Sequence, residues 1–121
     1  PSRGLGDVYK RQELKISTID NQLFYKINNF SPFGIGNPKP KFIINDVVIR
    51  YPRVVGEKHL SFYFEDSYST RIKAISFGSL GTKLGDVIKS SAPIKSALVS
   101  VTLNSWDGQE NVELNVEDLI V

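Results

Sequence analysis

Aromatic and basic residues alternate along two neighbouring stretches in the middle of the chain, a combination that could bind a single nucleic-acid strand. In the first stretch, His59, Ser61 and Tyr63 share one face of a predicted strand. In the second, Arg71 and Lys73 share one face of the next. Unpaired bases stack on aromatic rings, and cations follow the phosphates. The candidate contact residues are Arg53, Lys58, His59, Tyr63, Arg71, Lys73 and Trp106.

Each of these candidates also has a structural interpretation. A polar face is expected on the outside of many sheets, so the pattern between residues 59 and 73 also fits a solvated surface. Trp106 could stack on a base or a ribose, or it could cap the open end of a barrel. For His59, a structural hydrogen bond is favoured over a phosphate contact. The pattern therefore defines a site only if the fold brings these side chains together.

The chain offers no constellation of catalytic residues. It has no Cys and one His, so neither a thiolate metal site nor a His-rich one can be assembled. Gly34-Ile35-Gly36 is flanked by prolines with no helix after it, which argues against a phosphate-binding loop. We expect no catalytic residue, metal ligand or cofactor in this chain. The acids near its end are expected to form a solvated strand face; they are Glu110, Glu113, Glu117 and Asp118.

Charge is unevenly distributed along the chain. The formal net charge of +2 comes from the first twelve residues, because 12 basic and 12 acidic residues remain from Glu13 onward. Residues 39–95 hold ten basic and five acidic residues, whereas residues 96–121 hold five acidic and no basic residues. The total charge is therefore no argument for nucleic-acid binding, but its distribution would allow one positive face.

The first twelve residues differ in character from the rest. Residues 7–12 resemble the translation of a transposon-end adapter used in sequencing libraries, so we interpret segment 1–12 as non-native. A genuine basic arm is the alternative. The 121 residues contain no Met, and we expect a piece of a longer protein with one domain of modest core. Without Cys a reducing compartment is permitted, and we expect a cytoplasmic location.

A short helical region is predicted before the main domain. Residues 13–30 have the pattern of a short strand followed by a helix with an apolar stripe. We expect this stripe to face a preceding domain. Residues 31–40 contain three Pro and two Gly and are a predicted linker.

From residue 41 to residue 121 the pattern alternates and predicts five strands. They cover residues 42–51, bent near Asn45-Asp46, and then 59–65, 71–77, 97–104 and 111–117. Asp107-Gly108 is a hairpin turn between the last two. Residues 78–91 contain three Gly and are expected to be irregular, with room for one helical turn. Closing five strands into a barrel protects their edges. The fold class is thus mainly β, an OB-fold-like barrel, with an SH3-like barrel left open by periodicity alone.

Several motifs resemble those of one enzyme family. The segment Pro32-Phe33-Gly34-Ile35-Gly36-Asn37-Pro38-Lys39-Pro40 resembles the PFGxGNPxP linker of RecJ-type single-strand-specific exonucleases. Arg53 to Leu60 is similar to that family's R-x-x-G-x-x-H-L. The remaining matches follow in the family's order: Ala74 to Gly78, Leu84-Gly85-Asp86, Asn104 to Gly108, and Glu117-Asp118-Leu119.

The resemblance implies the OB domain of a 5′–3′ exonuclease that acts on single-stranded DNA in recombination and repair. It implies an upstream DHH/DHHA1 catalytic core in the same chain, with Mn²⁺ or Mg²⁺, and assigns residues 13–30 to the tail of the DHHA1 domain. The partners implied are single-stranded DNA and that core, with no membrane. No Asp-His-His motif is present here, so no catalytic residue is carried over. A second hypothesis, favoured by the neutral charge, is a structural or protein-docking barrel that braces the core without contacting DNA.

Overall fold

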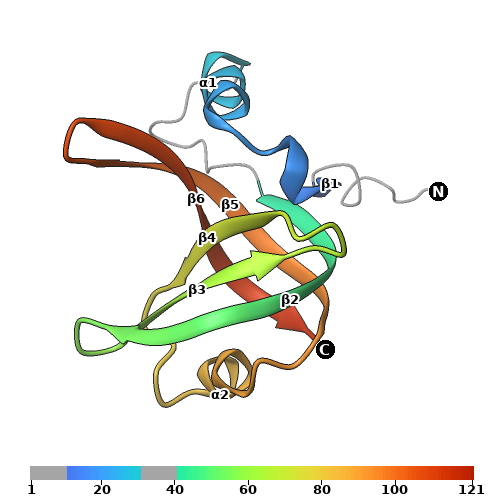
Figure 1. Cartoon of the computed structure of the whole chain (residues 1–121), viewed down its shortest axis with the longest axis vertical. Coiled ribbons are helices and arrows are strands. Elements are labelled where there is room, and N and C mark those ends of the chain that lie inside the picture. The colour runs from blue at the N-terminus through green and yellow to red at the C-terminus, as the bar shows by residue number, and fades with distance from the viewer. Residues whose placement is uncertain (1–10, 31–40) are drawn as a thin grey trace.

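A computed structural model describes residues 11–30 and 41–121 of the chain (Figure 1). The predicted linker at 31–40 and residues 1–10 of the segment interpreted as non-native lie outside the described residues. In chain order, the elements are β1 (Arg11–Glu13), the 3₁₀ helix η2 (Ile16–Thr18), α1 (Asn21–Phe30), β2 (Lys41–Val55), β3 (His59–Glu65), β4 (Arg71–Ser76), α2 (Lys83–Ser90), β5 (Ile94–Trp106) and β6 (Gln109–Ile120).

Five of the six strands close into a barrel. Hydrogen bonding connects them in the order β2-β3-β4-β6-β5, and β5 pairs back with β2. All of these pairings are antiparallel except β4 with β6, which is parallel. Along the chain, the connection between β4 and β5 contains α2. This arrangement confirms the predicted OB-fold-like barrel.

Strand β2 belongs to both sides of the barrel because it changes partner midway. Its residues up to Val47 pair with β5, and its residues from Val48 onward pair with β3. The change of partner coincides with the predicted bend at Asn45-Asp46, where Asp46 has a φ of 58°. One long bent strand can therefore close the barrel without a separate corner.

The core follows from the alternation of apolar residues along the strands. Leu60, Phe62 and Phe64 of β3 are completely buried, as the pattern predicts. The pattern predicts that Leu103 and Val112 point inward as well, but they are only half-buried. The hairpin that joins β5 and β6 extends beyond the barrel (Figure 1), which leaves these two residues at its edge.

The segment expected to be irregular contains an eight-residue helix, α2. Thr82 caps its start by accepting a hydrogen bond from the Gly85 N–H, and Ile88 on its inner face is completely buried. Gly85 suggested irregular structure, but its role is steric: a Cβ there would overlap the carbonyl group of Ser79. Tertiary packing therefore outweighs the low helix propensity of this glycine.

Residues 11–27 pack on the barrel of the same chain. Strand β1 pairs in parallel with the start of β2, and Ile16 and Ile19 are buried in the barrel core. Leu23, Phe24 and Ile27 of α1 pack against that core as well. The apolar stripe expected to face a preceding domain therefore covers the barrel. None of the described helices is long and apolar enough to cross a membrane.

The effect of a substitution on the free energy of unfolding tests whether residues 11–27 pack on the barrel. Ile19 is 7% exposed, and replacing it with Ala should lower the free energy of unfolding by about 2–5 kcal/mol, because it removes buried methyl groups and leaves a cavity. Ile120 is 57% exposed, and Ile120→Ala is the matched control, with an expected change of less than about 0.5 kcal/mol. Urea unfolding measures both. Equal effects would contradict the packing of this segment on the barrel.

Candidate nucleic-acid interface

The outer face of β2, β3 and β4 brings most of the predicted contact residues together. Tyr63 stands opposite Arg50 of β2 on one side and opposite Lys73 of β4 on the other. Cross-strand partners point to the same face of a sheet, so these side chains form one row. Tyr63 is 37% exposed and lies outside the core. Arg71 lies on the same face of β4, two residues before Lys73, and stands opposite Glu65 of β3.

A second tyrosine, Tyr51, joins this row through an irregularity in β2. The register with β3 shifts between Arg50 and Arg53, and Tyr51 within the shift has a φ of 56°. Its ring meets that of Tyr63 edge to face, with 6.3 Å between centroids, and the Arg71 guanidinium carbon lies 5.2 Å from the Tyr51 ring centroid. Tyr51 is not among the contact residues predicted from the sequence. The signal was the Tyr51-Pro52 step, because proline within a strand marks a bulge or an edge.

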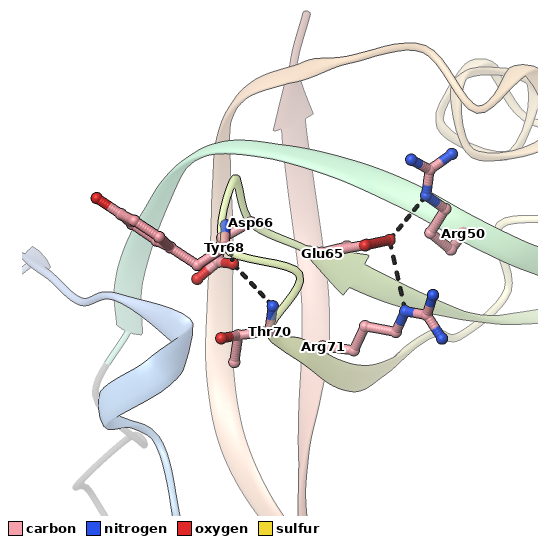
Figure 2. Close-up of polar contacts among 6 residues, drawn as sticks. All are labelled: Arg50, Glu65, Asp66, Tyr68, Thr70 and Arg71. Atoms are coloured by element: carbon pink, nitrogen blue, oxygen red, sulfur yellow. Dashed lines mark hydrogen bonds and ion pairs between the residues drawn. The ribbon is translucent and has the colours of Figure 1, made fainter.

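Glu65 is the buried carboxylate of this face. Its Oε1 accepts a hydrogen bond from Arg50 Nε at 2.8 Å and lies 3.4 Å from Arg71 Nε (Figure 2). The hydrogen bond from Arg50 lowers the pKa of Glu65, and the positive charge of Arg71 adds to this; together they outweigh desolvation, which acts in the opposite direction. One anion therefore holds two arginines, and the group keeps a surplus of positive charge.

The turn between β3 and β4 positions Arg71. Asp66 Oδ1 accepts hydrogen bonds from the backbone N–H groups of Tyr68 and Thr70, both at 2.9 Å (Figure 2). A side chain that binds the backbone two residues ahead stabilises a tight turn. The Tyr68 ring points away from the two arginines. The turn thus fixes the start of β4 and leaves Tyr68 off the candidate face.

Arg53 and Lys73 lie further along the same face. Lys73 Nζ is 4.0 Å from Glu113 Oε2, an ion pair with β6. A cleft of about 430 Å³ lies beside Lys73 and is lined also by Arg53 of β2 and Asn104 of β5. A larger cleft of about 790 Å³ shares Lys73, Asn111 and Val112 with it and continues to the start of α1. Basic residues therefore line a groove that crosses the barrel beside β4.

Lys58 and His59 stand at the opposite end of β3 from Arg71. Lys58 is exposed in the loop between β2 and β3, so it does not join the row around Tyr63. His59 Nδ1 accepts a hydrogen bond from the Gly78 N–H at 2.8 Å, and its ring packs edge to face with Phe77 at 5.2 Å. This geometry matches the structural hydrogen bond that was favoured for His59. The side chain of Trp106 lies outside the described part of the structure.

Helix α1 is fastened to the hairpin of β5 and β6, which forms one side of the groove. The Asn21 side-chain amide donates to the Glu110 carbonyl at 2.9 Å, and the Tyr25 hydroxyl donates to Glu110 Oε1 at 2.7 Å. This second hydrogen bond raises the pKa of Tyr25. Nothing in the sequence pattern indicated these contacts, because the partners are more than eighty residues apart.

The described residues do not form a metal site. Among residues 11–30 and 41–121, no three His, Asp or Glu side chains are grouped as metal ligands. The groove offers the ring of Tyr63, cations and amides beside the carboxylates of Asp20 and Glu113, and its ring and cations suit a polyanion with exposed rings.

The charge of Glu65 can be tested through pH. Glu65→Gln keeps the shape of the side chain and one acceptor oxygen. Because the native pKa lies below the unfolded value of about 4.3, the carboxylate stabilises the fold above that pH, and this contribution is lost as the pH falls through the native pKa. Urea unfolding should show a larger free energy of unfolding for the wild type than for the variant at about pH 7, and the difference should shrink as the pH falls through the lowered native pKa of Glu65. If the difference in free energy of unfolding between the wild type and Glu65→Gln does not change with pH, the charge of Glu65 does not stabilise the fold.

Comparisons with known proteins show which family and which fold this chain resembles. A family model described as the RecJ OB domain matches residues 12–118. Among solved structures, RecJ from Thermus thermophilus in complex with Mg²⁺ superposes with a TM-score of 0.54 at 23% sequence identity. The match covers 83% of this chain and 14% of the Thermus chain, so this chain spans a small part of that protein. No curated protein matched.

The family match bears on the segment before the barrel. The family model begins at residue 12 and includes the segment that packs on the barrel, and nothing in it confirms that residues 13–30 are the tail of a DHHA1 domain. The structural match to Thermus RecJ supports the fold. Since the family model spans most of the chain, the chain belongs to the RecJ OB domain family.

Proposed function

We propose that this chain is the single-stranded-DNA-binding OB domain of a RecJ-like 5′–3′ exonuclease that acts in DNA recombination and repair. The catalytic core, with Mn²⁺ or Mg²⁺, would belong to the rest of the parent protein. The observation that carries the proposal is the exposed pair Tyr51 and Tyr63, with Arg71 beside Tyr51 and with Tyr63, Arg71 and Lys73 lining one cleft. Rings and cations in this arrangement suit a strand whose bases are unpaired.

In this proposal the strand crosses β3 and β4 between the hairpin of β2 and β3 and the hairpin of β5 and β6. Bases stack on the two tyrosines, and the phosphates pass Arg53, Arg71 and Lys73. The width of the groove would select single strands over duplexes. Stacking on a ring adds to this selection, because it requires bases that are not paired with a second strand. The domain would hold the strand while the core cleaves it.

Stacking is tested by removing the rings one at a time. Tyr51→Ala and Tyr63→Ala should each weaken binding of single-stranded DNA by about 1–3 kcal/mol, the value of one base stacked on an aromatic side chain. Tyr68→Ala is the matched control, because Tyr68 is 87% exposed but points away from the face. Fluorescence anisotropy with the 121-residue chain measures the affinities. If Tyr68→Ala weakens binding as much as the other two, the stacking role is wrong.

Phosphate contacts are tested by the salt dependence of binding. Arg71→Gln/Lys73→Gln should lower affinity and reduce the slope of log K against log salt by about 0.7 for each cation that contacts a phosphate of a single strand. Lys89→Gln is the control, since Lys89 is exposed in α2, away from the groove (Figure 1). The slope is measured by titrations at several salt concentrations.

A bracing or protein-docking barrel is the second candidate function. The ion pairs favour it, because Glu65 and Glu113 offset part of the positive charge of Arg50, Arg71 and Lys73. On this alternative the double variant would keep both its affinity and its salt slope, and that result would reject the DNA-binding proposal for these residues.

A further inference from the structure

The larger cleft has features that DNA backbone binding does not use. It lies between the start of α1 and the first half of β4, and its volume of about 790 Å³ is in the range of roughly 300–1,000 Å³ of small-molecule sites. Ile16, Ile19 and Val112 supply an apolar part of its lining, and Gln22 and Asn111 supply amides. A site for phosphate alone would need neither the apolar lining nor the amides.

One wall of this cleft is an open strand edge. In the described chain, β6 pairs with β4 only at Ala74 and Ile75, so the edge of β4 before Ala74 has no strand beside it. The Asp66 N–H donates to the Thr70 carbonyl, so this carbonyl points toward the end of β3. Pairs alternate in an antiparallel ladder, so the N–H and C=O of Arg71 point away from β3, toward the open edge. Backbone donors and acceptors thus face the cleft.

The position of the cleft relates it to the proposed strand path. Tyr63, Arg71 and Lys73 line its mouth and also belong to the candidate face. A strand stacked on Tyr63 therefore passes directly over the opening. Asp20 lies on the opposite wall, where its carboxylate accepts a hydrogen bond from the Leu23 N–H. An anion at that wall disfavours a phosphate inside the cleft, while the cations at the mouth can hold the phosphates outside.

We propose that this cleft receives one nucleobase, turned out of the bound strand and held by its edge. The planar faces of the base contact the apolar lining, and its polar edge bonds to the backbone of Arg71 and to the amides of Gln22 and Asn111. Such an edge-on site resembles the way single-stranded nucleic acids are held when their bases are splayed out. The inference rests on the proposed function, because the base belongs to a strand already held on the outer face.

The test compares a strand that has bases with one that lacks them. An oligothymidylate of about eight nucleotides is within the roughly 4–16 nucleotides that one OB fold covers. An abasic oligomer of the same length keeps the phosphate charge. In ¹H–¹⁵N spectra of the 121-residue chain, the side-chain amides of Gln22 and Asn111 should shift with oligothymidylate and stay unchanged with the abasic oligomer, whose phosphates still reach Arg71 and Lys73.

Matched variants give a second readout. Asn111→Ala should weaken oligothymidylate binding about two- to tenfold, the loss of one hydrogen bond, and leave abasic binding unchanged. Gln109→Ala is the control, because Gln109 is an exposed amide on the same strand outside the cleft.

The outcomes separate this inference from the function it rests on. Equal shifts with both oligomers would show that only phosphate enters and would overturn the base site. Shifts at Tyr51 and Tyr63 with none at Gln22 and Asn111 would also overturn it and would leave the open edge of β4 to a peptide strand. No response anywhere to either oligomer would overturn the proposed function together with the base site.

Discussion

The short parallel pairing between β4 and β6 is the contact on which the rest of the structure depends. It consists of Ala74 opposite Leu114 and Ile75 opposite Asn115, and within the described residues it alone closes the ring of strands on this side. Ala74 and Leu114 are completely buried, so the closure is sealed by the core beneath it. Because the pairing stops there, the first half of β4 has an open edge. The same contact thus closes the barrel core and leaves the open edge of β4 that lines the groove.

Electrostatics on the outer face are set by Glu65. A carboxylate shared between Arg50 and Arg71 fixes both guanidinium groups, and it reduces the positive charge that a polyanion would meet. The attraction for a polyanion that remains comes from the one positive charge that Glu65 leaves on Arg50 and Arg71, and from Arg53 and Lys73. A chain with no net charge from residue 13 onward can therefore carry a local positive track, and its affinity would depend on stacking as much as on charge.

The sequence predicted the barrel and about half of the candidate face. Period-two alternation placed β3, with Tyr63 outside, and the following strand, with Arg71 and Lys73 outside; both follow from local pattern alone. Tyr51 was missed because a bulge changes which face a residue occupies, and alternation cannot show where a strand departs from it. Helix α2 was missed for a related reason: Gly85 is needed for contact with Ser79, a tertiary requirement that local propensity does not contain.

The start of the chain was the part least predictable from pattern, since its partners are distant in sequence. An apolar stripe indicates that one face of a helix is buried, but it does not show which part of the protein buries it. Here the stripe packs on the barrel. The hydrogen bonds of Asn21 and Tyr25 to Glu110 then hold the hairpin of β5 and β6, which extends beyond the core. A binding wall that is already fixed costs less entropy to order when a ligand arrives. Residues 16–22 therefore form the groove together with the barrel, and the family match at residues 12–118 includes them.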